Sequence, residues 1–110
     1  MQEFAAGLED IGGKLTDISG WVGMQAMKNP DEVGAAAVDY LRLAGHLVYA
    51  YFWARMAQVA LPKAKDDAFY RAKVETAKFY FARLLPESEM LAKRIKTGSK
   101  NLLALEAEAF

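Results

Sequence analysis

Cysteine is absent from this chain of 110 residues, so the sequence offers neither a disulfide nor a thiolate metal ligand. That absence fits a reducing compartment, and we predict a cytoplasmic protein. An excess of charge of one sign is also missing, because the 14 basic side chains are balanced by 14 acidic ones. A nucleic-acid-binding domain would need a basic surplus on one surface. We therefore predict no nucleic-acid partner.

Targeting segments and long hydrophobic runs are missing as well. Glu3, Glu9 and Asp10 lie where a secretory signal would carry basic residues, so we predict no signal peptide. The uncharged stretch between Arg42 and Arg55 is shorter than the ~18 residues that a membrane-spanning helix needs. We therefore predict no membrane span.

The chain is instead organised around one strongly hydrophobic segment, residues 30–61. Asn29 followed by Pro30 and two acidic residues is typical of a helix start, and Pro62 ends the segment. Its middle is apolar around the whole circumference, so neighbouring helices must bury it on more than one side.

Three further segments are predicted to be helical. Residues 2–28 carry an apolar seam at alternating steps of four and three, flanked by a row of small residues that would allow close approach of a neighbour. Residues 66–85 follow with Asp66 as the expected N-cap, and residues 87–97 come after Pro86 and end before Gly98. No strand pattern is present. We predict one all-α domain over residues 1–110, an antiparallel four-helix bundle with a short C-terminal tail.

The search for chemistry centres on His46, the only histidine. Its own helix offers no carboxylate or hydroxyl one turn away, except the phenol of Tyr49. We interpret it as a buried histidine bonded to another helix. Glu87 and Glu89 suit a helix start, where acidic residues are favourable. We therefore assign no catalytic, cofactor-binding or metal-binding residue.

Aromatic side chains are more abundant than a small bundle can hide. We expect a contiguous apolar patch that faces a partner, and self-association through it. The candidate interface or pocket residues are His46, Tyr49, Phe52, Trp53 and Trp21.

The C-terminal quarter of the sequence has a more specific pattern. An aromatic-rich helix end with a Leu-Leu-Pro sequence is followed by a short helix that ends in Ile-Lys-x-Gly. After this helix come a pair of leucines and, at the C-terminus, an acidic residue and a phenylalanine. The residues are Phe79, Tyr80, Phe81, Ala82, Leu84, Leu85 and Pro86, then Ile95, Lys96 and Gly98, then Leu102, Leu103, Glu108 and Phe110. This pattern resembles the C-terminal end of bacterial acyl-CoA dehydrogenases, from about Asn29 onward and more loosely in the first helix.

The resemblance implies the C-terminal fragment of a larger flavoenzyme that uses FAD to oxidise acyl-CoA to 2-enoyl-CoA. No residue here matches that family's catalytic base or its flavin contacts. The chain would thus serve packing or assembly, with the remaining dehydrogenase domains or a second subunit as partner. Two alternatives are a free-standing helical interaction module without enzymatic activity, and a small bundle with its own ligand pocket beside His46.

Overall fold

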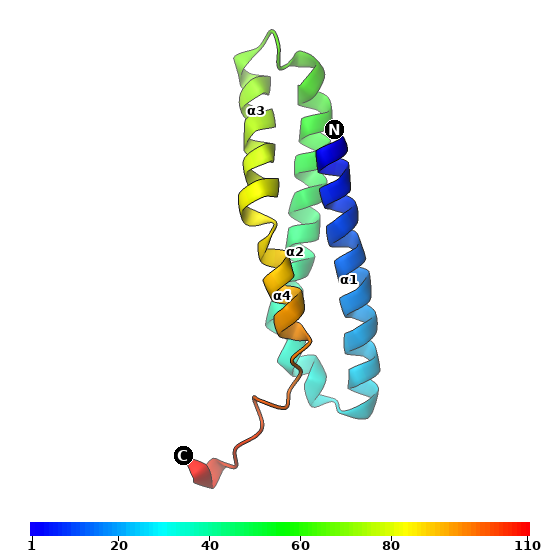
Figure 1. Cartoon of the computed structure of the whole chain (residues 1–110), viewed down its shortest axis with the longest axis vertical. Helices are drawn as coiled ribbons and strands as arrows, with labels where there is room; N and C mark the ends of the chain where they lie inside the picture. The colour runs from blue at the N-terminus through cyan, green and yellow to red at the C-terminus, as the bar shows by residue number, and fades with distance from the viewer.

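The chain folds into helices joined by short links, as a computed structural model of residues 1–110 shows (Figure 1). The α-helices are α1 (Gln2–Lys28), α2 (Asp31–Ala60), α3 (Ala68–Phe79) and α4 (Glu87–Ile95). Leu61–Lys63 and Ala107–Ala109 form 3₁₀ turns, and Tyr80–Leu84 forms a π-helical turn. The structure has no strand, which confirms the all-α prediction.

The predicted four-helix bundle is not confirmed, because α3 and α4 lie end to end. Figure 1 shows α1 running in one direction, α2 returning, and α3 followed by α4 running back along α2. The bundle therefore has three antiparallel rods, of which the third is divided by the π-helical turn and Pro86.

Backbone dihedral angles explain why the chain reverses at two links and not at Pro86. Asn29 and Asp67 are extended, with φ of −153° and −138°, and each directs the chain into a new rod. Leu85 and Pro86 keep right-handed helical angles, with φ of −57° and −58°. Proline removes one backbone donor, but its fixed φ fits a helix. The third rod therefore continues through Pro86.

The starts of α2 and α3 are capped by short polar side chains. Asn29 Oδ1 accepts a hydrogen bond from the Asp31 amide at 3.1 Å, which confirms the predicted cap of α2. The prediction for α3 was wrong by one residue, because Asp67 and not Asp66 is the cap. Asp67 Oδ1 accepts from the Phe69 amide at 2.9 Å. The extended backbone at Asp67 allows its carboxylate to reach back to the first turn, as an N-cap requires.

The predicted seam of α1 faces the core. Phe4, Ile11 and Ile18 are buried, and they pack against α2 and the third rod. Gly12 belongs to the row of small residues, but a Cβ there would meet nothing within 4 Å, so this position does not require a close approach. The close approach occurs at Gly7, where a Cβ would lie 2.5 Å from Phe81 Cδ1.

The rods cover α2 on two sides and leave its remaining side exposed. We call this side the back face of α2. Its exposed large hydrophobic residues are Val33, Val38, Leu41, Val48, Tyr49, Tyr51, Phe52 and Val59. With about 100° per residue, these positions fall within an arc of about 160°. The expected apolar patch is therefore present.

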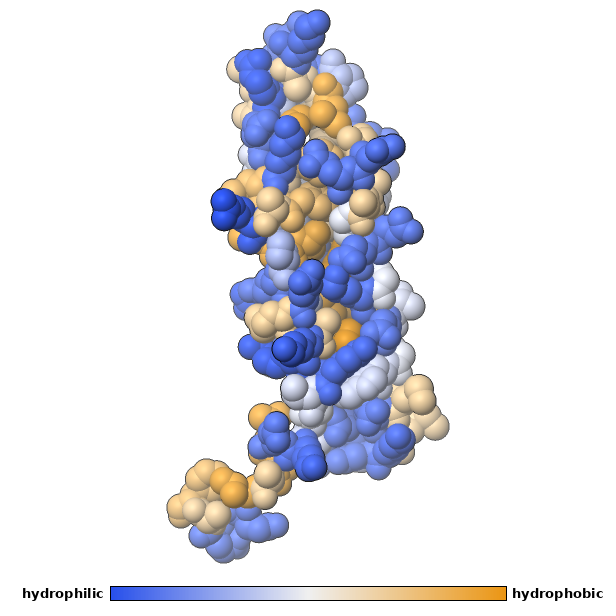
Figure 2. Space-filling model, in the orientation of Figure 1, coloured by the Kyte–Doolittle hydropathy of each residue, from blue (hydrophilic) through white to orange (hydrophobic).

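The opposite face of the molecule is more polar. Figure 2 shows hydrophilic side chains over most of the near face, where α1 and α4 lie in front of α2, with hydrophobic side chains between them. The C-terminal tail extends away from the bundle and also carries hydrophobic surface (Figure 2). Its large apolar residues, Leu102, Leu103, Leu105 and Phe110, are all exposed.

The tail is tied to the bundle at its first residue. Gly98 ends α4 with φ of +74°, in the left-handed region that favours glycine, as the sequence predicted. Ser99 is buried, and its hydroxyl donates to Glu32 Oε1 at 2.6 Å. This bond joins the end of the third rod to the first turn of α2. No helix of the structure combines the length and hydrophobicity needed to cross a membrane.

Candidate functional site

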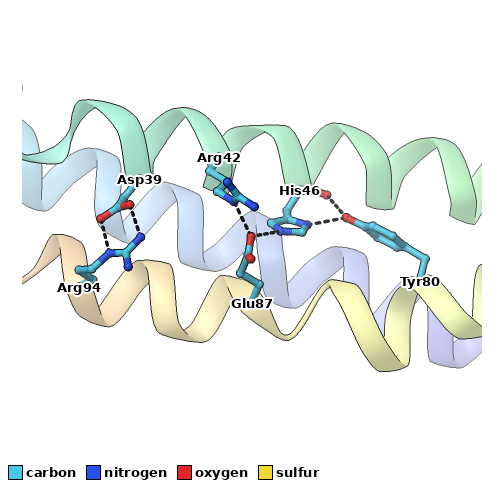
Figure 3. Close-up of polar contacts among 6 residues, drawn as sticks. All are labelled: Asp39, Arg42, His46, Tyr80, Glu87 and Arg94. Carbon is cyan, nitrogen blue, oxygen red and sulfur yellow. Dashed lines mark hydrogen bonds and ion pairs between the residues drawn. The ribbon is translucent and has the colours of Figure 1, made fainter.

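Several polar side chains lie along the contact between α2 and the third rod (Figure 3). Arg42 and His46 lie one turn apart on α2, and both contact Glu87, the first residue of α4. Tyr80, the first residue of the π-helical turn, approaches His46 from the other side. Two stretches distant in sequence, α2 and the third rod, thus supply one cluster.

The imidazole of His46 is bonded at both nitrogen atoms, and its side chain is only 12% exposed. Nε2 lies 3.0 Å from Glu87 Oε1, and Nδ1 lies 2.9 Å from the Tyr80 hydroxyl. With its hydrogen on Nε2, the neutral ring donates to the carboxylate and accepts from the phenol. The interpretation of His46 as a histidine bonded to another helix agrees with this geometry.

The Tyr80 hydroxyl has a second acceptor within reach. It lies 3.1 Å from the backbone carbonyl oxygen of His46, as well as 2.9 Å from Nδ1. A hydroxyl has one hydrogen, so it donates to only one of these atoms at a time. Burial, with Tyr49 and Glu87 nearby, raises the pKa of Tyr80 to about 12. The phenol is therefore neutral in the folded protein at physiological pH.

Glu87 is held as a carboxylate by two neighbours. Arg42 Nε donates to Glu87 Oε1 at 2.7 Å, and this bond is the main reason why the pKa of Glu87 lies below its ordinary value. The bond to His46 lowers the pKa further. Since Glu87 is ionised at neutral pH, it acts as an acceptor for both α2 side chains.

Further along the same contact, α2 and α4 form a second ionic link. Arg94 binds Asp39 with two hydrogen bonds, Nε to Oδ2 at 2.8 Å and a terminal nitrogen to Oδ1 at 2.6 Å. This bidentate pairing lowers the pKa of Asp39. Figure 3 shows both links spanning the space between the two rods.

A cavity of about 430 Å³ opens beside the cluster. Tyr49 and Leu84 supply its apolar walls, and Arg42, His46 and Glu87 lie at its polar side. No buried side-chain nitrogen or oxygen atom lacks a hydrogen-bond partner. The nitrogen atoms of His46 are both engaged within the protein, so the cluster as it stands holds two rods together and presents no free base to the cavity.

The cavity does not fit a flavin dinucleotide. A diphosphate needs several donors, typically the amides of a helix N-terminus. The helix start that borders this cavity carries the carboxylate of Glu87, and the one cation, Arg42, is already bonded to that carboxylate. Nor do His, Cys, Asp and Glu side chains gather anywhere in groups of three that could hold a metal ion.

The sequence-predicted site residues do not form one site. His46 and Tyr49 line the same cavity, but the Phe52 side chain is 55% exposed on the back face of α2. Trp53 and Trp21 are half-buried and pack against the core. Sequence reasoning missed Tyr80 and Arg42, and it interpreted Glu87 only as a residue suited to a helix start. The spacing of Arg42 and His46 by one helical turn was the signal that could have indicated a shared acidic partner.

Comparison with known families agrees with the C-terminal pattern. Residues 1–106 match the family model described as acetyl-CoA dehydrogenase C-terminal like. The chain belongs to this family. The match includes α1, for which the resemblance was looser, and it also includes every residue of the α2–α4 cluster. No curated protein matches the chain.

Proposed function

We propose that this chain is the C-terminal helical domain of an acyl-CoA dehydrogenase-type flavoprotein and that its task is packing or assembly. The observation that carries this proposal is the family match over residues 1–106. The FAD-dependent oxidation of acyl-CoA to 2-enoyl-CoA would occur in other domains of that protein. We also keep the cytoplasmic location as a prediction.

Two features of the structure support a packing role. The back face of α2 exposes eight large hydrophobic residues along one helix, and such patches mark interaction surfaces. The polar cluster at His46 is satisfied within the bundle and joins α2 to α4. The polar groups of the interior are thus satisfied within the chain, while one exterior face is largely apolar.

The first test asks whether the native polypeptide is larger than the 12.2 kDa chain. An antiserum raised against the chain should detect, in cells that express the native gene, a longer protein that carries flavin. Detection of a free 12.2 kDa protein without flavin would contradict the proposal and favour the free-standing interaction module.

A second test uses the chain itself. Incubated with FAD, it should elute from gel filtration without flavin, and it should not reduce an electron acceptor when acyl-CoA is added. Stoichiometric flavin retained on the column would contradict the assignment of catalysis to other domains.

A further inference from the structure

The back face of α2 differs between its two halves. Its first half contains the small residues Gly34, Ala37, Ala44 and Gly45 between the exposed Val33, Val38 and Leu41, whereas its second half contains the exposed Val48, Phe52 and Val59. The first half also lies beside a groove of about 510 Å³ between α1 and α2, lined in part by Val22, Gly23 and Ala37. This groove is a depression beside the first half that a large exposed side chain of the second half, such as Phe52, could fill.

We propose that the occupant of this face is a second copy of the chain, with the two α2 helices packed antiparallel about a two-fold axis near Leu47. This register places Gly34 opposite Val59, and Leu41 opposite Phe52. Phe52 of each copy would then enter the groove of the other. The proposal deepens the packing role proposed above and rests on it.

The charges on α2 select the same direction. Between Val33 and Val59 the fixed charges are Asp39, Arg42 and Arg55, and the first two are bonded to the third rod. At the ends of the helix, Asp31 is exposed at the start and Lys63 is exposed just past the end. Antiparallel packing brings Asp31 of one copy opposite Lys63 of the other. Parallel packing would place like charges together, which is unfavourable.

The chain exposes more surface than a compact monomer of the same mass would expose. The chain exposes 7619 Å², whereas a compact monomer of this mass exposes about 6,100 Å². Part of the excess belongs to the extended tail. The excess is about 1,500 Å² with the tail included, and a standard interface buries roughly 800 Å² of each partner. A two-fold interface also uses one patch twice, as the back face of α2 would.

Sedimentation equilibrium of the full chain at micromolar concentration is the first test, and we expect a dimer. Phe52→Glu places a charge in the centre of the interface and should raise the dissociation constant by roughly 100-fold. Phe79→Glu is the matched control, because Phe79 is a similarly exposed residue on α3 outside the back face. Equal effects of the two variants, or a wild-type monomer, would overturn the proposal.

Disulfide trapping tests the register, and the chain has no cysteine of its own to interfere. An equimolar mixture of Gly34→Cys and Val59→Cys chains should form mixed disulfide dimers on oxidation, while each variant alone should not. A cysteine at Gly34 meets no neighbour within 4 Å, and neither does one at Gly13 on α1, which serves as control with Val59→Cys. Cross-linking of each variant with itself would indicate parallel packing and overturn the register.

These outcomes separate this inference from the proposed function. A monomeric chain whose native, longer protein carries flavin would refute the α2 pairing and leave the proposed function standing. A dimeric chain that exists natively as a free 12.2 kDa protein without flavin would refute the proposed function and leave the pairing standing.

Discussion

His46 Nε2 lies 3.0 Å from Glu87 Oε1, although 41 positions separate the two residues in the chain. Together with the Arg42–Glu87 bond, this contact fixes the start of α4 against the middle of α2. A rod interrupted by a π-helical turn and a proline has lost regular backbone hydrogen bonds there, and side-chain bonds to α2 hold the two parts in line.

Replacement of His46 by glutamine should therefore reduce stability and leave the fold intact. Glutamine cannot bridge Glu87 and Tyr80 with the geometry of the ring, so we expect a loss of about 1–3 kcal/mol, typical of a buried hydrogen bond. Urea unfolding followed by circular dichroism measures the loss. If His46→Gln in a longer native flavoprotein kept its stability but abolished turnover, the histidine would be catalytic and the structural assignment wrong.

Stability should fall in acid through Asp39 and Glu87. Both folded-state pKa values lie below the ordinary values of 3.8 and 4.5, so the unfolded chain binds more protons as the pH decreases. The two carboxylates contribute fully to the free energy of unfolding when the pH is above these ordinary values. This contribution is lost as the pH falls through the folded pKa values. Arg94→Met should flatten the stability profile below about pH 5. Lys93→Met, on the same helix and without a bonded carboxylate, should not.

Stability should also fall in alkali through Tyr80. Its folded pKa of about 12 exceeds the ordinary value of 10.0, so the contribution is complete below pH 10.0 and is lost as the pH rises toward about 12. Phenolate absorbance should show one tyrosine that ionises only above the others or together with unfolding. In Tyr80→Phe this late phase should disappear, whereas Tyr51→Phe, at an exposed position, should retain it.

Two glycines of α1 should respond to alanine in opposite directions. Gly7→Ala forces the Phe81 ring away from its contact with Phe4, where the ring centroids are 5.2 Å apart, and should cost about 1–3 kcal/mol. Gly13→Ala meets open space and should stabilise the helix by up to about 1 kcal/mol. Thermal unfolding of the two variants measures both effects. Stabilisation by Gly7→Ala would show that the Phe81 contact is not tight.

The sequence by itself determined the helices, because their signals are local. Asn29 with Pro30 marks the start of α2, Pro62 marks its end, and Gly98 takes the left-handed conformation after α4. The family could also be recognised from sequence, since its pattern at residues 79–110 depends on residue types and spacing. The seam of α1 followed from periodicity alone.

Only the tertiary structure decided how many rods there are and which residues form the cluster. A proline marks a weak point in a helix, but whether the chain reverses there depends on the dihedral angles of its neighbours, and Leu85 stays helical. The partners of His46 come from segments 34 and 41 positions away. The spacing of Arg42 and His46 could indicate a shared acidic partner, but which residue that is depends on how the third rod lies along α2. The exposed back face of α2 follows from the same packing. Only two other rods lie against this central helix, so they cover it on only two sides.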